Sequence, residues 1–186
     1  MNKALIIIKS PGIGDLQILL NYIHEISREI DKPVSILAQK STGARSVLKH
    51  DKHIEEVIDL GKKDFLNIVN KIKFKKFNQC YIYSDSVRLW LIAKFAGISK
   101  IYHYPFFSKK FANFYKTAKK FTEKILQRKI DSASKIYWDK TSIEKAKKDY
   151  NIQSNVKNIV CGISASGPTK RWDLDNYIKL FKEINS

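Results

Sequence analysis

A carboxylate stands directly after two glycines near the start of the chain. Ser10, Gly12, Gly14 and Asp15 lie in the stretch SPGIGDLQ, which follows the apolar run ALIIIK. Glycines let a backbone approach a ligand closely, and a carboxylate held there can act as a base. The other interpretation is structural, because an aspartate at a helix start caps free N–H groups. The residues alone leave both roles of Asp15 open.

The glycine turn lacks two features of a dinucleotide site. Gln17 stands where that pattern requires its third glycine. The second predicted strand ends in Ala38, Gln39 and Lys40, so it has no acid to hold a ribose. In addition, Asp15 places a negative charge where a pyrophosphate would bind. We therefore expect no NAD and no other cofactor.

Short β-branched runs alternate with helical patterns through most of the chain. Strands are predicted at residues 4–9, 33–39, 54–60, 79–85 and 100–104, and helices at residues 16–30, 42–49, 65–72, 87–96 and 141–150. This alternation is typical of an α/β fold, a Rossmann-like parallel sheet flanked by helices. The turn with Asp15 then lies at the carboxyl end of the first strand, where such sheets place their ligands.

The polar stretch at residues 151–158 predicts a linker. After it, a strand is predicted at residues 159–164, followed by a loop and a helix at residues 173–184. About thirty residues cannot enclose a core of their own. We therefore interpret residues 1–155 as the Rossmann-like domain, and residues 156–186 as the first strand, loop and helix of a truncated second domain.

The charge favours an anionic partner. Thirty-five Lys and Arg against 18 Asp and Glu give a formal charge of +17, which suits a phosphorylated sugar, an acidic lipid headgroup or nucleic acid. Cys80 and Cys161 lie in apolar runs without C-x-x-C spacing, so no disulfide framework or zinc site is expected. His50 and His53 have no third ligand beyond Asp51, so a polar surface is expected there and not a metal site.

The apolar runs are too short for a signal peptide or a membrane span. We therefore expect a cytoplasmic protein, with at most peripheral contact at the inner face of the inner membrane.

Three stretches carry a resemblance to a known family. IIIKSPGIGDLQ, GISASGPTKRW and LDNYIKLFKEI, in this order and with β-α alternation between them, resemble glycosyltransferase family 9, the ADP-heptose:lipopolysaccharide heptosyltransferases. The resemblance covers the whole chain but roughly the first half of a family member. It implies the acceptor-side half of a GT-B fold, in which two Rossmann-like domains face each other across a cleft and the second binds the nucleotide sugar.

The resemblance also implies a reaction. A heptose or similar sugar is transferred with inversion and without a metal from ADP-heptose, or a related nucleotide sugar, to a lipopolysaccharide core hydroxyl. Asp15 matches the base, and Ser10, Gly12 and Gly14 shape the acceptor side. The resemblance assigns binding of the donor phosphates to four residues of the second motif: Ser164, Ser166, Thr169 and Lys170.

Residues 106–129 mix aromatic side chains with many lysines and predict a basic amphipathic helix or helix pair. Three roles stay open for them: packing on the sheet with solvated lysines, contact with an anionic lipid-linked core saccharide, or nucleic-acid binding. No nucleic-acid motif supports the last role.

Because the remaining strands of the nucleotide-sugar domain are absent from this sequence, we expect no turnover from these residues alone. The rival hypothesis is a non-enzymatic, basic Rossmann-like module that binds an anionic glycan or nucleic acid.

Overall fold

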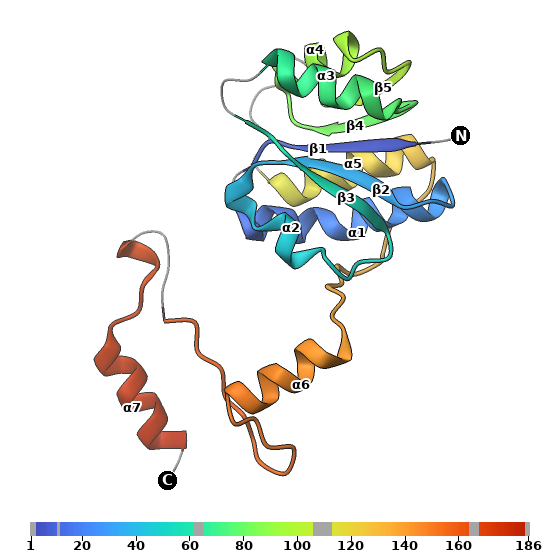
Figure 1. Cartoon of the computed structure of the whole chain (residues 1–186). Helices are drawn as coiled ribbons and strands as arrows, with labels where there is room; N and C mark the ends of the chain where they lie inside the picture. The colour runs from blue at the N-terminus through green and yellow to red at the C-terminus, as the bar shows by residue number, and fades with distance from the viewer. Residues whose placement is uncertain (1–2, 11, 62–64, 106–112, 164–167, 185–186) are drawn as a thin grey trace. The chain divides into compact units, whose positions relative to one another are not determined.

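The computed structural model describes residues 3–10, 12–61, 65–105, 113–163 and 168–184 (Figure 1). The chain divides into two compact units, unit 1 (Met1–Asp139) and unit 2 (Lys140–Ser186). The domain boundary expected after residue 155 stays a prediction. No helix within the described ranges is long and apolar enough to cross a membrane.

Unit 1 is built on a parallel sheet of five strands. The strands are β1 (Ala4–Ile8), β2 (Val34–Ala38), β3 (Ile54–Asp59), β4 (Gln79–Tyr83) and β5 (Lys100–His103). Their order is β3-β2-β1-β4-β5, and every neighbouring pair is parallel. All five predicted strands are confirmed, each slightly shorter than its apolar run.

Helices cover both faces of this sheet, which explains why the central strands are continuously apolar. Alternate residues of β1 enter two hydrophobic clusters: Ala4, Ile6 and Ile8 join one, and Leu5 and Ile7 join the other. Helices α1 (Ile13–Glu29), α2 (Ala44–Val47) and α5 (Phe114–Leu126) pack on the first face, and α3 (Phe65–Lys75) and α4 (Val87–Phe95) on the second (Figure 1). A strand buried on both faces needs no polar alternation.

Strand β1 occupies the centre of the sheet and the point where the strand order reverses. Ile6 aligns with Ile36 of β2 on one side and with Tyr81 of β4 on the other. The chain leaves β1 toward β2, whereas β4 is reached only after β3, so the strand order reverses at β1. Open α/β sheets bind ligands at this switch point.

One predicted helix differs from the sequence expectation, and residues 106–129 agree with one of the two alternatives expected for them. The helix predicted at residues 42–49 is replaced by a 3-10 turn (Lys40–Thr42) and the short α2, because Gly43 between them has a left-handed φ of 64° that ends the first turn. Residues 106–129 contain a single helix, α5, within their described part, and residues 106–112 lie outside the described ranges.

Helix α5 is fastened to α1 and to the sheet. Arg128 donates to Glu25 over 2.7 Å, and the hydroxyls of Tyr83 and Thr122 lie 2.8 Å apart in the interior. The segment after α5 returns across α1, where the Asn21 amide donates to the Ser132 carbonyl over 3.1 Å. These contacts complete the face of the sheet that carries the Asp15 turn.

Unit 2 contains α6 (Lys140–Asp149), a 3-10 turn (Pro168–Lys170) and α7 (Leu174–Ile184). The predicted helices at residues 141–150 and 173–184 are confirmed. The strand predicted at residues 159–164 is wrong over its described part, because residues 159–163 are irregular. A strand requires a hydrogen-bonded neighbour, and the described residues of unit 2 contain none.

Candidate functional site

The Asp15 turn joins the end of β1 to the start of α1. Gly12 is the N-cap of α1 in an extended conformation (φ −92°), and no side chain caps the helix. Asp15 lies three residues later, in the first helical turn, so the N-cap interpretation of Asp15 is wrong. Its charge still complements the helix dipole at this end.

The Asp15 carboxylate folds back over the turn. A Cβ atom built on Gly12 would lie 3.5 Å from Oδ2 of Asp15, whereas one built on Gly14 would meet no described atom within 4 Å. Among the described residues, none forms an ion pair or a hydrogen bond with this half-buried carboxylate. Within the described part of the chain, the oxygens of this carboxylate are therefore not occupied by another residue.

The neighbouring strand ends place further polar groups at this edge of the sheet. Ser10 is half-buried directly before the turn, and Ser84 is buried after β4, where its hydroxyl accepts from the Ser86 N–H over 3.2 Å. The side-chain amide of Gln39, after β2, donates to the Lys9 carbonyl over 2.7 Å. This bond ties the loop after β2 to the chain segment that carries Asp15.

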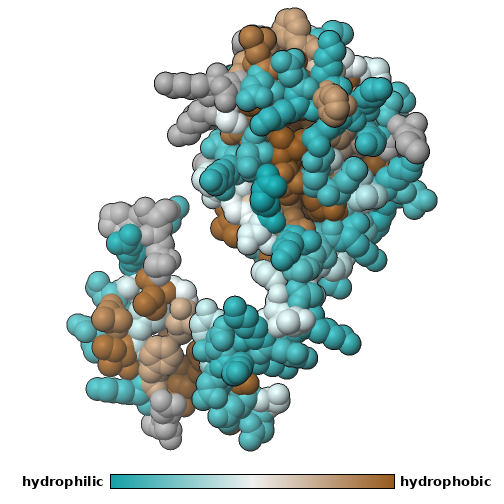
Figure 2. Space-filling view, viewed as in Figure 1, coloured by the Kyte–Doolittle hydropathy of each residue, from teal (hydrophilic) through white to brown (hydrophobic). Residues whose placement is uncertain are grey.

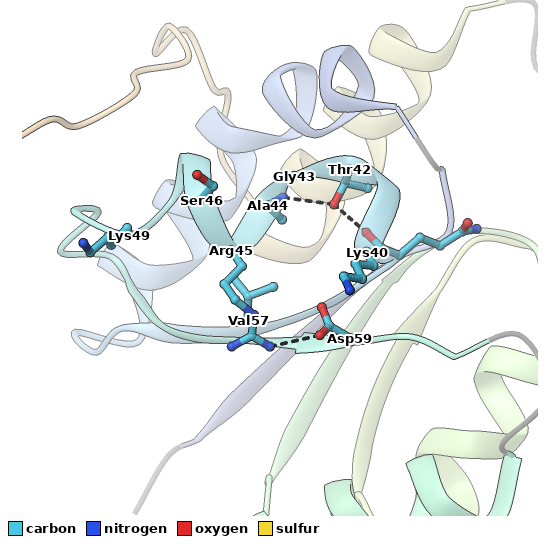
Figure 3. Close-up of a pocket in the computed structure, with 10 residues that line it drawn as sticks. Lys40, Thr42, Gly43, Ala44, Arg45, Ser46, Lys49, Val57 and Asp59 are labelled. Carbon is cyan, nitrogen blue, oxygen red and sulfur yellow. Dashed lines mark hydrogen bonds and ion pairs between the residues drawn. The ribbon is translucent and has the colours of Figure 1, made fainter. Parts of the chain in front are cut away.

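A pocket of about 390 Å³ lies beside that loop, which we call the α2 pocket (Figure 3). Its charged lining residues are Lys40, Arg45, Lys49 and Asp59. Sequence reasoning missed this site. The available signal was three cations spread around one glycine in the stretch QKSTGARSVLK.

A larger groove of about 850 Å³ runs between edge strand β5 and helix α5, and we call it the α5 groove. Lys116, Lys120 and Lys124 line it at intervals of four residues, so they share one face of α5. Phe121 lines it too and packs against the buried tyrosines of the sheet, with its ring 4.9 Å from that of Tyr104. Residues 113–129 thus combine the packing role with a cationic surface.

The histidines are more buried than the sequence indicated. His24 and Asp51 are both buried, with Nε2 and Oδ2 2.7 Å apart, and the His53 ring lies 4.8 Å from that of His24. Burial lowers the pKa of His53, and the nearby His24 acts in the same direction. The described residues contain no group of three or more potential metal ligands.

The donor-side candidates lie in unit 2. Thr169 and Lys170 belong to its 3-10 turn and are exposed, and Ser164 and Ser166 lie outside the described residues. Nearby, Trp172 packs edge-on against Tyr177, whose hydroxyl donates to the Gly162 carbonyl over 3.3 Å. The phosphate-binding role of these candidates stays a prediction.

No protein-family model and no curated protein matches this sequence. Solved structures do match. ADP-heptose lipopolysaccharide heptosyltransferase II from E. coli has a TM-score of 0.73 at 14% identity over 98% of this chain. A glycosyl transferase family 9 structure from Veillonella parvula has a TM-score of 0.73 at 12% identity over 99% of it. The chain has the fold of glycosyltransferase family 9.

The E. coli heptosyltransferase WaaC with ADP-2-deoxy-2-fluoro heptose is also similar, with a TM-score of 0.67 at 10% identity over 98% of this chain. The chain spans 61% of the length of the first two structures and 65% of WaaC. The glycosyltransferase family 9 resemblance and the α/β, GT-B-type fold are therefore confirmed for the residues compared.

Proposed function

We propose that the protein is a glycosyltransferase of the heptosyltransferase type, which moves a heptose or similar sugar from ADP-heptose, or a related nucleotide sugar, to a lipopolysaccharide core hydroxyl. The observation that carries this proposal is the position of the Asp15 carboxylate, which pairs with no described residue, at the switch point of a family 9 fold. Further support comes from the compared structures, which are an ADP-heptose lipopolysaccharide heptosyltransferase and WaaC with ADP or with ADP-2-deoxy-2-fluoro heptose.

Asp15 performs the first proton transfer in the proposed mechanism. It accepts the proton of the acceptor hydroxyl, whose oxygen attacks the anomeric carbon of the donor on the face opposite the diphosphate. The new C–O bond forms as the bond to the diphosphate oxygen breaks, so one displacement inverts the configuration. Gly14 leaves room for the acceptor because a Cβ atom built on it would meet no described atom within 4 Å.

The leaving diphosphate needs positive charge and hydrogen-bond donors. We assign these to Lys170 and to the hydroxyls of Ser164, Ser166 and Thr169, with no metal ion in the step. A lysine contributes a compact charge with three donors, which suits a phosphate oxygen. Turnover by these residues alone is not expected, because adenine and ribose contacts of the donor have no candidates among them.

The acceptor is proposed to be an anionic, lipid-linked core saccharide. The lysines of the α5 groove support this, since they line an aromatic-floored surface on the unit that carries Asp15. Phe74 is 88% exposed between Lys73 and Lys75, an arrangement suited to peripheral contact at the inner face of the inner membrane. Cosedimentation with vesicles containing an anionic lipid tests this contact, and absence of binding at low salt would refute it.

Asp15→Asn tests the mechanism. In a form of the protein that is active in transfer, we expect this change to lower kcat by about 10²–10⁴, because a general base contributes on this scale. Mass spectrometry of a heptose-free core acceptor incubated with ADP-heptose measures the transfer.

The matched control for this change is Asp31→Asn. Asp31 is exposed after the opposite end of α1 and has a positive φ of 51°, which asparagine accepts well. This variant is expected to retain transfer. Near-normal turnover of Asp15→Asn would remove Asp15 from the mechanism.

A further inference from the structure

The α2 pocket is held in shape by the loop between β2 and α2. The Thr42 hydroxyl is buried, donates to the Gln39 carbonyl over 2.7 Å and accepts from the Ala44 N–H over 3.2 Å. Gly43 follows with a φ of 64°, a left-handed conformation that glycine adopts without the steric strain other residues would meet. The wall of the pocket is therefore built by the backbone before any ligand arrives.

Positive charge dominates the lining of this pocket. Lys40, Arg45 and Lys49 are opposed by a single carboxylate, that of Asp59. Figure 3 shows Arg45 reaching from α2 to Asp59 at the end of β3, where Nη2 lies 3.2 Å from Oδ2. This ion pair holds the guanidinium at the pocket wall while several of its five N–H donors stay available.

The other lining groups suit a sugar better than a bare anion. The Asp59 carboxylate repels an anion but accepts hydrogen bonds from hydroxyls, and Ser46 adds a hydroxyl group. Val57 and Ala44 provide apolar surface for the C–H face of a sugar ring. The volume of about 390 Å³ lies near the lower end of ligand pockets, about 300–1,000 Å³, and suits one sugar unit.

The position of the pocket connects it with the proposed reaction. Gln39 lines the pocket and also donates to the carbonyl of Lys9, the residue before Ser10. The pocket and the Asp15 turn therefore lie at the same edge of the sheet, on loops joined by a hydrogen bond.

We propose that the α2 pocket binds the anionic group of an acidic saccharide, a phosphate or carboxylate carried on a sugar, through Lys40 and Arg45, whose side chains lie on either side of Asp59 (Figure 3). This inference rests on the proposed function in one respect: it makes the pocket a subsite for part of the acceptor away from the reacting hydroxyl. The ring hydroxyls meet the Asp59 carboxylate.

NMR titration of the whole chain, with backbone amide signals of Gly43 and Ala44 as readout, tests the inference. Glucose 6-phosphate and glucuronate are the two probes, and whichever saturates these signals identifies phosphate or carboxylate as the recognised group. Glucose is expected to bind at least tenfold more weakly than the better probe, and so is inorganic phosphate. Unchanged Gly43 and Ala44 signals with both probes would overturn the inference. Inorganic phosphate binding as tightly as glucose 6-phosphate would also overturn it.

Substitutions locate the binding. Lys40→Ala and Arg45→Ala are each expected to weaken binding of the better probe about tenfold. Lys100→Ala removes the same charge at the exposed start of β5, on the opposite edge of the sheet, and is expected to change nothing. Equal weakening by Lys100→Ala would show general charge attraction and reject the site.

Asp15→Asn separates this inference from the proposed function. The variant is expected to retain saccharide binding while it loses transfer. If Asp15→Asn loses transfer and neither probe binds at the α2 pocket, the proposed subsite is rejected and the proposed base is retained. Saccharide binding at the pocket with undiminished transfer by Asp15→Asn supports the site and rejects the proposed base.

Discussion

Units 1 and 2 use the same kinds of segment with opposite results. In unit 1, the residues of β1 and β2 are all buried, because strands pair on both sides and helices cover both faces. In unit 2, α6 and α7 contain no buried residue, and Val160 is 91% exposed. An apolar run thus forms a strand only where a neighbouring strand pairs with it. The apolar face of a helix becomes part of a hydrophobic core only where a sheet covers it.

Removal of a core side chain is expected to have the largest effect on this contrast. Leu19 of α1 is fully buried, so Leu19→Ala should lower the free energy of unfolding by about 2–5 kcal/mol. Ile178 of α7 is 44% exposed, and Ile178→Ala should change it by less than about 0.5 kcal/mol. Urea unfolding followed by circular dichroism measures both, and equal losses would contradict the difference between the units.

Loss of a buried charge in unit 1 comes second. Burial acts to raise the pKa of Glu25, but the hydrogen bond from Arg128 and the charges of Arg28 and Arg128 outweigh it, so the pKa is lowered. The stability gained from this carboxylate is present above its usual pKa of 4.5 and is lost as the pH falls through the lowered value.

Glu25→Gln should therefore lower the free energy of unfolding at pH 7 by about 1–3 kcal/mol, since two guanidinium groups lose their charged acceptor. Chemical unfolding at pH 7 measures this loss. Glu55→Gln, an exposed residue of β3, is the control and should have little effect. A similar loss in both variants would reject the role of the cluster formed by Glu25, Arg28 and Arg128.

The smallest expected effect is a pH dependence confined to unit 1, which contains all four histidines. Burial lowers the pKa of His53, and the charges of His24, Arg28 and Lys52 add to this while Asp51 opposes it. Because the unfolded chain binds the proton first, stability contributed by neutral His53 is full above about pH 6.5 and falls as the pH drops through the lowered pKa.

Between pH 7 and 5 we expect His53→Gln to reduce the loss of stability, because glutamine does not titrate. Chemical unfolding midpoints at several pH values measure this difference between the variant and the parent protein. Tyr137, whose ring lies 6.0 Å from that of His53, is left unchanged in both. An unchanged pH profile would show that His53 does not titrate in this range.

The strands and the Asp15 turn were predictable from sequence because their causes are local. Doubly buried strands such as residues 4–8 need uninterrupted apolar runs, and the apolar stripe of the helix starts just after its N-cap residue, Gly12. The strand expected at residues 159–164 failed because its pairing depends on chain segments that a local pattern does not contain.

The remaining site features were not predictable because they are non-local. The bond from Gln39 to Lys9 and the ion pair from Arg45 to Asp59 join residues from different loops and strands. The buried pair of His24 and Asp51 joins a helix to a turn, whereas the spacing of His50 and His53 suggested only surface polarity. Such contacts follow from the packing of the sheet and not from residue spacing.

The central position of β1 also sets the order in which the protein is completed during synthesis. β1 is synthesised before the other strands of its sheet, yet its second neighbour, β4, begins only at Gln79, and Glu25 of α1 pairs with Arg128, 103 residues later. Pairings that span so much sequence are formed slowly, because a long loop must close before they gain any contact energy. The segment that carries the proposed base is therefore synthesised before the rest of its sheet and is among the last to reach its finished surroundings.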